Sequence, residues 1–264
     1  MARRIAVAAT GEFGADLLER LAAEQEVVQL LTRPDRRRGR GRQLGAPPAK
    51  ETAVRLGIPV EQPAKLDSSV SIGADTVVVC AYGLLIPNEL LERGLWLNVH
   101  PSLLPRWRGA APVERALMAG DEETGVTIHQ TVEALDAGPV AAQRVFAIAP
   151  EDDAGAVYAR AAEVAAELLR DVLAHDEPRF EPQPEEGATY AEKIGPEDRE
   201  LDPAPPAQEL VDRVRALSPH IGARLGDLIV WRARVGEDGS FEPVEVQPAG
   251  GRRMAYDAYL RGRR

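Results

Sequence analysis

A chain of 264 residues with 44% hydrophobic and 28% charged residues can form two domains, and this composition excludes a disordered protein. Its single cysteine, Cys80, excludes a framework of intrachain disulfides, and no apolar run approaches the roughly 20 residues of a membrane span. The net charge of −10 arises in residues 151–202, which hold 16 acidic and 5 basic residues, so the remainder is nearly neutral and compatible with a nucleic-acid partner. We expect a soluble, cytoplasmic monomer.

The first part of the chain alternates strands with helices. Residues 4–9 predict a buried strand, residues 14–24 a helix with three leucines on one face, and residues 27–31 a second strand. This order is typical of a parallel sheet with right-handed crossovers. The glycines Gly11 and Gly14 do not complete a G-x-G-x-x-G pattern, so the sequence gives little support for a nicotinamide cofactor.

Six arginines and one acid lie between residues 33 and 42, and the glycines and proline of this segment predict an exposed loop. A run of charge is most often a solvated surface. Here arginine is well suited to phosphate, and the segment opposes the acidic balance of the chain, which favours a nucleic-acid contact. The candidate contacts are Arg36, Arg37, Arg38, Arg40 and Arg42.

The candidate chemistry begins with two polar residues near the end of a predicted strand. Residues 75–80 predict the most deeply buried strand, and Asn98 and His100 lie in the next apolar run, where a spacing of two places both side chains on one face. Ligands of an open α/β sheet bind beyond the carboxyl ends of its strands. An amide there can donate to a developing oxyanion, and an imidazole can move a proton near neutral pH.

Asp136 is the third candidate. It lies between strand-like runs at residues 125–131 and 140–148, and the turn sequence Ala-Gly-Pro follows it. A carboxylate beside an imidazole raises its basicity and fixes its orientation. Taken singly, these residues also fit ordinary roles, such as a core histidine and a turn aspartate. We expect His129, on the first of these strands, to be structural.

The sequence NVHPSLLPRWRGAAPVERALMAGDEETGVTI, followed by LDAGPV, resembles the catalytic region of the 10-formyltetrahydrofolate-dependent formyltransferases, most closely the branch that acts on methionyl-tRNA. That family uses an Asn-x-His pair, an SLLP loop and an aspartate in an LD(T/A)G turn, which match Asn98, His100, residues 102–105 and Asp136. Its AYGxxxP loop matches residues 81–87, and its basic insertion is similar to RPDRRRGRG.

The resemblance implies transfer of a formyl group from the co-substrate 10-formyltetrahydrofolate to the α-amino group of methionyl-tRNA, for translation initiation. Asn98 would donate to the oxyanion, and His100, oriented by Asp136, would relay the proton. The basic insertion would reach the tRNA acceptor arm. The single cysteine and the scattered histidines give no metal-ligand spacing. The implied folate contacts are Tyr82, Gly83, Leu84, Leu85, Ile86, Ser102, Leu103, Leu104 and Pro105.

We expect an α/β catalytic domain over residues 1–176, with a Rossmann-like, open, mostly parallel sheet and a long closing helix. Residues 177–205 are rich in proline and acids, which predicts a linker. Residues 206–264 contain a predicted helix and two strands, consistent with part of a small OB-like β-barrel. The barrel of the family is longer, so we expect a shortened tRNA-binding domain, which need not form a closed barrel.

Three alternatives stay open at this point. A formyltransferase for a small amine, such as an amino sugar nucleotide, would use the same three residues without the basic segment. A hydrolase of 10-formyltetrahydrofolate would use them with water as acceptor. A non-catalytic RNA-binding protein would keep the arginines and have no use for Asn98, His100 and Asp136 together.

Overall fold

The computed structural model describes residues 2–38, 43–202 and 204–262. The chain forms two compact units that interleave along the sequence. The first unit comprises residues 1–108, 125–145 and 159–188, and the second comprises residues 109–124, 146–158 and 189–264.

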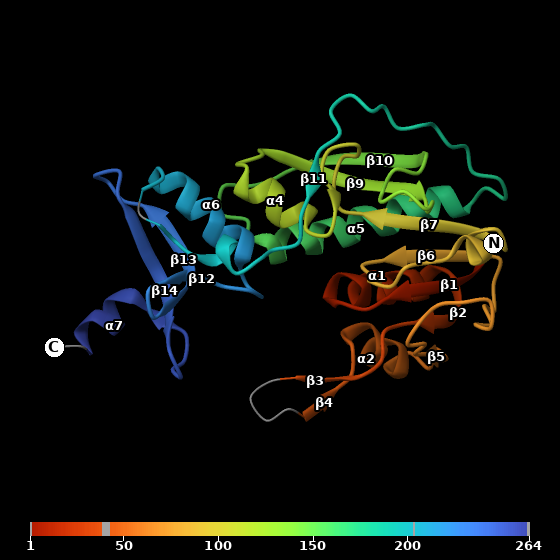
Figure 1. The fold of residues 1–264 in the computed structure, drawn as a ribbon, viewed down its shortest axis with the longest axis horizontal. Coiled ribbons are helices and arrows are strands. Elements are labelled where there is room, and N and C mark those ends of the chain that lie inside the picture. The colour runs from red at the N-terminus through yellow and green to blue at the C-terminus, as the bar shows by residue number, and fades with distance from the viewer. Residues whose placement is uncertain (1, 39–42, 203, 263–264) are drawn as a thin grey trace. The chain divides into compact units, whose positions relative to one another are not determined.

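A seven-stranded sheet in the order β10-β9-β7-β6-β1-β2-β5 is the centre of the first unit (Figure 1). The strands β1, β2, β5, β6 and β7 pair in parallel, and β9 is antiparallel to β7. The expected mostly parallel α/β sheet is therefore confirmed. Its strands are β1 (Arg4–Ala9), β2 (Glu26–Leu31), β5 (Val60–Glu61), β6 (Thr76–Cys80), β7 (Leu95–His100), β9 (Glu123–Gln130) and β10 (Val140–Ala147).

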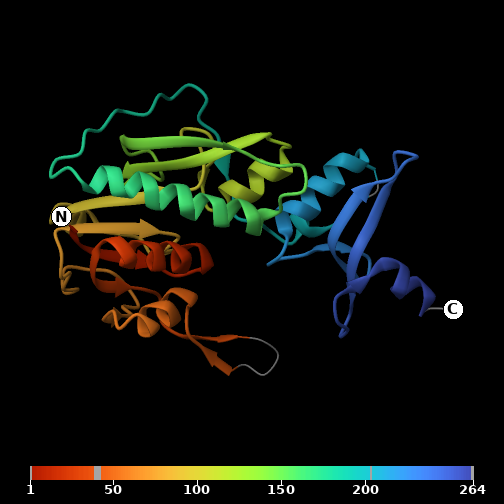
Figure 2. The same ribbon diagram turned by 180° about the vertical axis from the view of Figure 1, so that it is seen from behind.

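Helices flank this sheet, with α1 and α5 on the same face (Figure 2). The helix α1 forms where leucines recur at helical spacing, and Leu17, Leu18 and Leu21 are all buried. No helix among the described residues combines the length and apolar character needed to cross a membrane. The helices of this part are α1 (Glu12–Glu24), α2 (Pro48–Arg55), α3 (Asn88–Leu91) and α5 (Ala154–Leu173).

The basic segment contains a short antiparallel hairpin where the sequence predicts a loop. Strands β3 (Arg36–Arg38) and β4 (Gln43–Gly45) pair with each other and with no strand of the main sheet in the described structure. Side chains hold the base of this hairpin: Lys50 Nζ donates to both carboxylate oxygens of Asp35 at 2.8 Å, and Gln62 Nε2 donates to one of them at 2.7 Å. These partners are Lys50 of α2 and Gln62, the residue after β5, so the local sequence does not reveal them.

The second unit contains a four-stranded antiparallel sheet in the order β12-β13-β14-β15. The two longer strands are the predicted ones, and the flanking short strands were not predicted. The helix α6 buries Leu210, Val214 and Leu217 in one cluster with Val230 of the sheet. The elements are α4 (Pro112–Met118), α6 (Ala207–Leu217), α7 (Tyr256–Arg261), η1 (Glu197–Arg199), β8 (Arg108–Gly109), β11 (Tyr190–Ala191), β12 (Ala223–Leu225), β13 (Leu228–Val235), β14 (Phe241–Pro248) and β15 (Met254–Ala255).

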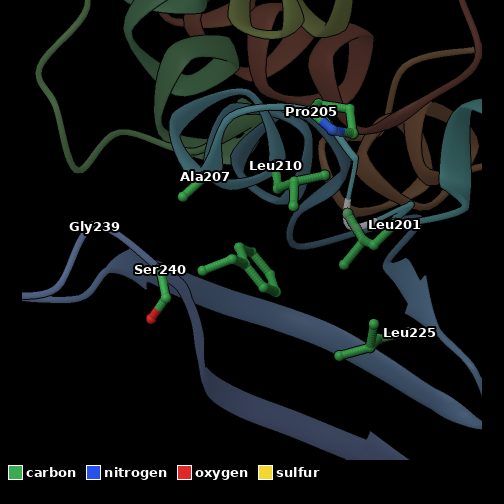
Figure 3. Close-up of a pocket in the computed structure, with 8 residues that line it drawn as sticks. Leu201, Pro205, Ala207, Leu210, Leu225, Gly239 and Ser240 are labelled. Atoms are coloured by element: carbon green, nitrogen blue, oxygen red, sulfur yellow. The ribbon is translucent and has the colours of Figure 1, made fainter.

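An apolar cavity of about 360 Å³ lies between α6 and this sheet (Figure 3). Leu210 of the helix faces it from one side, and Leu225 faces it from the other. The helix therefore covers only part of the apolar face of the sheet. The lining residues are Leu201, Pro205, Ala207, Leu210, Leu225, Gly239, Ser240 and Phe241.

Candidate active site

The site is built at the carboxyl end of β7, in the middle of the main sheet. Asn98 and His100 are two residues apart on this strand, so their side chains project to the same face. Pro101 follows at once and cannot donate to a ladder, which ends the strand at His100. The neighbouring strand β6 runs parallel to β7, so the loops that follow β6 and β7 leave the sheet at the same edge.

The antiparallel pairing of β7 with β9 brings His129 directly opposite Asn98. The His129 Nδ1 atom lies 3.0 Å from the carbonyl of Gln130, which can only accept, so Nδ1 carries the proton. Its Nε2 atom is then an acceptor for Asn98 Nδ2, at 2.9 Å. The sequence predicts a structural role for His129, whereas the structure places it inside the cluster, where it orients the Asn98 amide.

Asp136 is the point at which these side chains converge. Its Oδ1 atom accepts from Asn98 Nδ2 at 3.2 Å and lies 3.7 Å from His129 Nε2. Its Oδ2 atom lies 3.7 Å from Nδ1 of His100. The three residues chosen from the sequence are thus neighbours in space, and His129 joins them. Since the Asp136 side chain is only 12% exposed, its charge acts on both imidazoles with little screening by water.

The turn that carries Asp136 is tightly built. Asp136 has a φ of +48°, in the left-handed region that costs a residue with a Cβ atom. Two residues later, a side chain at Gly138 would collide with the carbonyl of Gln130. The glycine in the LDAG sequence is therefore required by close approach of two backbones, which lets the turn fold back over β9.

His100 is buried, with 4% of its surface exposed. Burial lowers its pKa below the ordinary value, and this effect outweighs the opposing influences of the Asp136 carboxylate and the hydrogen bond to Trp107. The sequence predicted raised basicity from Asp136, and that influence is present with the expected sign but is not the largest one. The Nε2 atom lies 2.8 Å from the Trp107 carbonyl and must donate to it. In neutral His100 the unprotonated nitrogen is therefore Nδ1, which faces Asp136.

In the loop after β6, some side chains are buried in the core and others are exposed to solvent. Tyr82 is buried in a cluster of the main sheet, and Leu84 and Ile86 pack against the same cluster. Gly83 has a φ of +75°, and Leu85 is 84% exposed. The sequence alone left open whether these residues are core or ligand contacts. In the structure Leu85 and the Gly83 backbone are accessible to a ligand, whereas the Tyr82 side chain is not.

The loop after β7 is held by a hydrogen bond within the loop and by two hydrogen bonds to Thr127 of β9. Ser102 Oγ donates to the Arg106 carbonyl at 2.7 Å, and Thr127 Oγ1 donates to the Ser102 carbonyl at 2.7 Å. Leu104 is buried and its amide donates to Thr127 Oγ1 at 3.1 Å. Leu103 and Pro105 are partly exposed. This rigid loop lies beside His100, and its accessible parts are backbone and small apolar surface.

The candidate nucleic-acid contacts are only partly described. Arg36 and Arg37 are exposed on β3, and Arg38 ends this strand. Arg40 and Arg42 lie outside the described residues. Asp35 is already engaged by Lys50, whose hydrogen bond lowers the pKa of that carboxyl. Because this is the single acid of the segment, the charge of the arginines is not offset locally.

Comparison with known proteins agrees with the resemblance found in the sequence. Residues 3–173 match the family model described as formyl transferase. A methionyl-tRNA formyltransferase from Halorhodospira halophila is 40% identical in an alignment that covers 100% of this chain and 97% of the relative. That alignment runs to 305 positions, more than the 264 residues of the chain, so the relative contains insertions.

Solved structures share the fold. A methionyl-tRNA formyltransferase from Clostridium thermocellum superposes with a TM-score of 0.65 at 16% identity, covering 93% of this chain and 98% of that one. An N-formyltransferase from Helicobacter canadensis, in complex with folinic acid and dTDP-3-aminofucose, gives a TM-score of 0.67 at 14% identity, covering 89% and 88%. Among the described residues, no group of three or more His, Cys, Asp or Glu side chains is arranged to hold a metal ion.

Proposed function

Because the chain belongs to the formyl transferase family, and within it to the methionyl-tRNA formyltransferases, we propose that the cluster around Asp136 transfers the formyl group of 10-formyltetrahydrofolate to the α-amino group of methionyl initiator tRNA. The observation that carries this proposal is the convergence of Asn98, His100 and His129 on one carboxylate. Such a cluster supplies an oxyanion donor and a proton carrier side by side.

The reaction exchanges one C–N bond for another. The unprotonated α-amino group attacks the formyl carbon, and the bond from that carbon to N10 of the folate then breaks. A proton must leave the attacking nitrogen and reach N10. His100 takes it at Nδ1, because Nε2 already donates to the Trp107 carbonyl. Asp136, with Oδ2 at 3.7 Å from Nδ1, stabilises the resulting imidazolium directly or through a water molecule.

Asn98 provides the donor for the oxyanion. In the free protein its amide nitrogen makes two contacts, to His129 at 2.9 Å and to Asp136 at 3.2 Å. The contact with Asp136 is the longer one. We propose that the oxyanion, as it forms, replaces Asp136 as the acceptor of this hydrogen, while the hydrogen bond to His129 keeps the amide in place. The carboxylate is then free to serve His100.

We propose that the folate binds at the loops that follow β6 and β7. Leu85 is 84% exposed and lies in the loop after β6. Leu135 is 63% exposed and directly precedes Asp136. Exposed leucines at a polar site are suited to the flat face of a ring system. The pterin would be held by the backbone of residues 82–86 and 102–105, because this part of the chain offers few free polar side chains.

We also propose a domain organisation for the chain. Residues 1–176 would carry the catalytic machinery, residues 177–205 the linker, and residues 206–264 a shortened OB-like domain for tRNA. The four-stranded sheet and the partly covered apolar face at α6 fit a reduced form of such a domain. We place the reaction in the cytoplasm, with the enzyme as a monomer.

An acceptor screen tests the proposed reaction. Radiolabelled 10-formyltetrahydrofolate is offered with charged initiator tRNA, free methionine, amino sugar nucleotides or water alone. We expect label to move to the charged tRNA at a much higher kcat/KM than to any small amine. Preferred transfer to an amino sugar would identify a small-amine formyltransferase, and release of formate with water alone would identify a hydrolase.

We expect the arginines of the basic segment, residues 33–42, to carry part of the tRNA affinity by binding phosphates. Neutralising Arg36, Arg37, Arg38, Arg40 and Arg42 together should make the plot of log K against log salt shallower by about 0.7–0.9 for each arginine–phosphate pair that the substitutions abolish. The affinity for tRNA is measured by fluorescence titration across a salt series. Formylation of a small amine surrogate should be retained, because the hairpin carries no residue of the catalytic cluster.

The matched control neutralises exposed arginines that are already paired. Arg55 and Arg170 bind Glu19 and Glu24 through side-chain hydrogen bonds. Their replacement by glutamine should leave the salt slope as it is. An unchanged slope in the hairpin variant would reduce these arginines to a solvated surface and favour the small-amine alternative.

A further inference from the structure

We infer that Gln183 is a positioning residue for the reaction, because it fixes the turn that presents the Asp136 carboxylate to His100. This inference rests on the catalytic role proposed above for Asp136. It gives residues 177–205 a function beyond that of a connection between domains.

Gln183 binds both ends of the turn with one side chain. Its Nε2 atom donates to the carbonyl of Asp136 at 2.8 Å and to the carbonyl of Gly138 at 2.7 Å. An amide group has two hydrogens, so both are used on this turn. The backbone hydrogen bonds at this turn are longer: Ala137 N donates to the carbonyl of Ala134 at 3.3 Å, and Gln130 N donates to the carbonyl of Pro139 at 2.9 Å. The hydrogen bonds from the Gln183 side chain are therefore shorter than the backbone hydrogen bonds of the turn itself.

The opposite side of the Gln183 amide is held by a buried arginine. Arg108 Nη2 and Nε donate to Gln183 Oε1 at 2.9 and 3.2 Å. Arg108 is only 3% exposed, so this charge-assisted bond is shielded from water and directional. Since Arg108 fixes the oxygen, the nitrogen must face the turn, which removes the ambiguity of the amide orientation.

The linker backbone delivers Gln183 to this place. Glu181 pairs with Val140 in both directions, with N–O distances of 2.7 and 2.9 Å, just after the turn. Pro182 and Pro184 flank Gln183, and proline restricts both its own φ and the residue before it to extended conformations. The glutamine is therefore presented with little backbone entropy left to lose.

The turn needs such support because its conformation is unfavourable on its own. Asp136 is in the left-handed region, and residues in that region persist when their surroundings determine them. A relaxed backbone at Asp136 would redirect its carboxylate away from Nδ1 of His100. A shift of about 1 Å in a catalytic group can cost about 100-fold in rate. The position of Gln183 thus has a direct consequence for turnover.

The test uses two substitutions in the full-length enzyme. Gln183→Ala removes the hydrogen bonds to both carbonyls and also leaves Arg108 without this partner. Gln183→Glu keeps the size and the acceptor for Arg108, but offers no donor to the two carbonyls and places a negative charge against them. We expect each variant to lower kcat for formylation of charged tRNA by about 10- to 100-fold, with little change in KM for the folate. Gln183→Glu decides the matter if Gln183→Ala does not fold.

A matched control separates positioning from general stability. Gln29 is buried, whereas Gln183 is partly exposed, but Gln29 likewise holds a loop: it donates to the Ser71 carbonyl and accepts from the Gly73 amide, each at 2.9 Å. Its loop precedes β6 and lies away from the catalytic turn in the sequence. Gln29→Glu should lower the melting temperature without changing kcat or the pH profile of kcat.

The pH profile and a double-mutant cycle report on Asp136 itself. The titratable groups that act on His100 are Asp136 and His129, and the Asp136 carboxylate raises its pKa. If the carboxylate moves away in Gln183→Ala, which introduces no charge of its own, the acid limb of the profile shifts to lower pH. In an Asp136→Asn background, Gln183→Glu should cause little further loss, because both changes disable the same step.

The outcomes are distinct. Near-normal kcat in Gln183→Glu, with Asp136→Asn impaired, overturns this inference alone. A loss in Gln183→Glu that is undiminished in the Asp136→Asn background also overturns it, since the glutamine would then act elsewhere. Full activity of Asp136→Asn removes the proposed catalytic role of the carboxylate and this inference with it.

Discussion

Replacing His100 or Asp136 by alanine is expected to lower kcat by about 10²–10⁴-fold in each case, the range for loss of a positioned proton carrier. His100 has one bare nitrogen, and that nitrogen faces the carboxylate at 3.7 Å. Without Asp136 the imidazolium formed during proton transfer loses its buried counter-charge. The double variant should lose clearly less than the product of the two single losses, because the pair acts as a unit. Single-turnover formylation of charged tRNA measures these losses.

We expect kcat to fall toward acid pH, as His100 becomes protonated. Burial holds the pKa of His100 below its ordinary value, so the imidazole is neutral at pH 7 and active as a base. The part of the acid limb that belongs to His100 should therefore lie at this lowered pKa, apart from the fall caused by protonation of the substrate's α-amino group. In Asp136→Asn the carboxylate no longer raises the pKa of His100, and the residual activity should show its acid limb at still lower pH. Using the same substrate throughout cancels the titration of its α-amino group.

His175 is the control for these variants, because it is an exposed histidine of the same unit. His175→Ala should retain the kcat of the parent enzyme. Near-normal turnover in His100→Ala or in Asp136→Ala would exclude the proposed proton relay, whatever the folate affinity.

Most of the main sheet could be predicted from periodicity. Residues 4–9 and 75–80 are continuous apolar runs, and all of β1 beyond Arg4 is fully buried between layers, as such runs predict for a parallel sheet. The expected proximity of Asn98 and His100 followed from strand geometry alone. The proximity of Asp136 did not follow from geometry, because one helix and two strands separate it from His100 along the chain. Its selection came from the turn sequence and the family resemblance.

The role of His129 could not be read from the sequence. Its alternating strand was predicted, but the register between β7 and β9 was not, and only this register sets His129 opposite Asn98. A shift of one residue would have turned the imidazole to the other face of the sheet. Strand identity is encoded locally, whereas pairing partners depend on the packed sheet.

Two further features depend on contacts between distant residues. The hairpin at Arg36–Arg38 lacks apolar alternation and is held at its base by Lys50 and Gln62. The link from Gln183 to Asp136 spans 47 positions. A proline-rich acidic segment predicts a solvated linker, and composition does not reveal that one uncharged residue in it binds the turn that carries Asp136.

Asn98→Ala is expected to lower kcat by about 10²–10³-fold, as for removal of a single oxyanion donor. The loss should appear in kcat and not in the affinity for folate, because the amide is proposed to bind charge that exists only in the transition state. Asn98→Asp should be at least as damaging. It is almost the same size, but it places an anion beside Asp136, 3.2 Å from the present position of the amide nitrogen, and it offers no donor to the oxyanion.

Asn88 is the matched control, as the other asparagine of the chain. It is exposed and donates to Glu133 at 3.1 Å. Asn88→Ala should leave kcat unchanged. Single-turnover formylation gives the chemical step, and calorimetric titration with a folate analogue gives the affinity. If Asn98→Ala weakens folate binding while kcat at saturation stays near that of the parent, Asn98 is a ground-state contact, and the oxyanion must be stabilised by another donor at the end of β7.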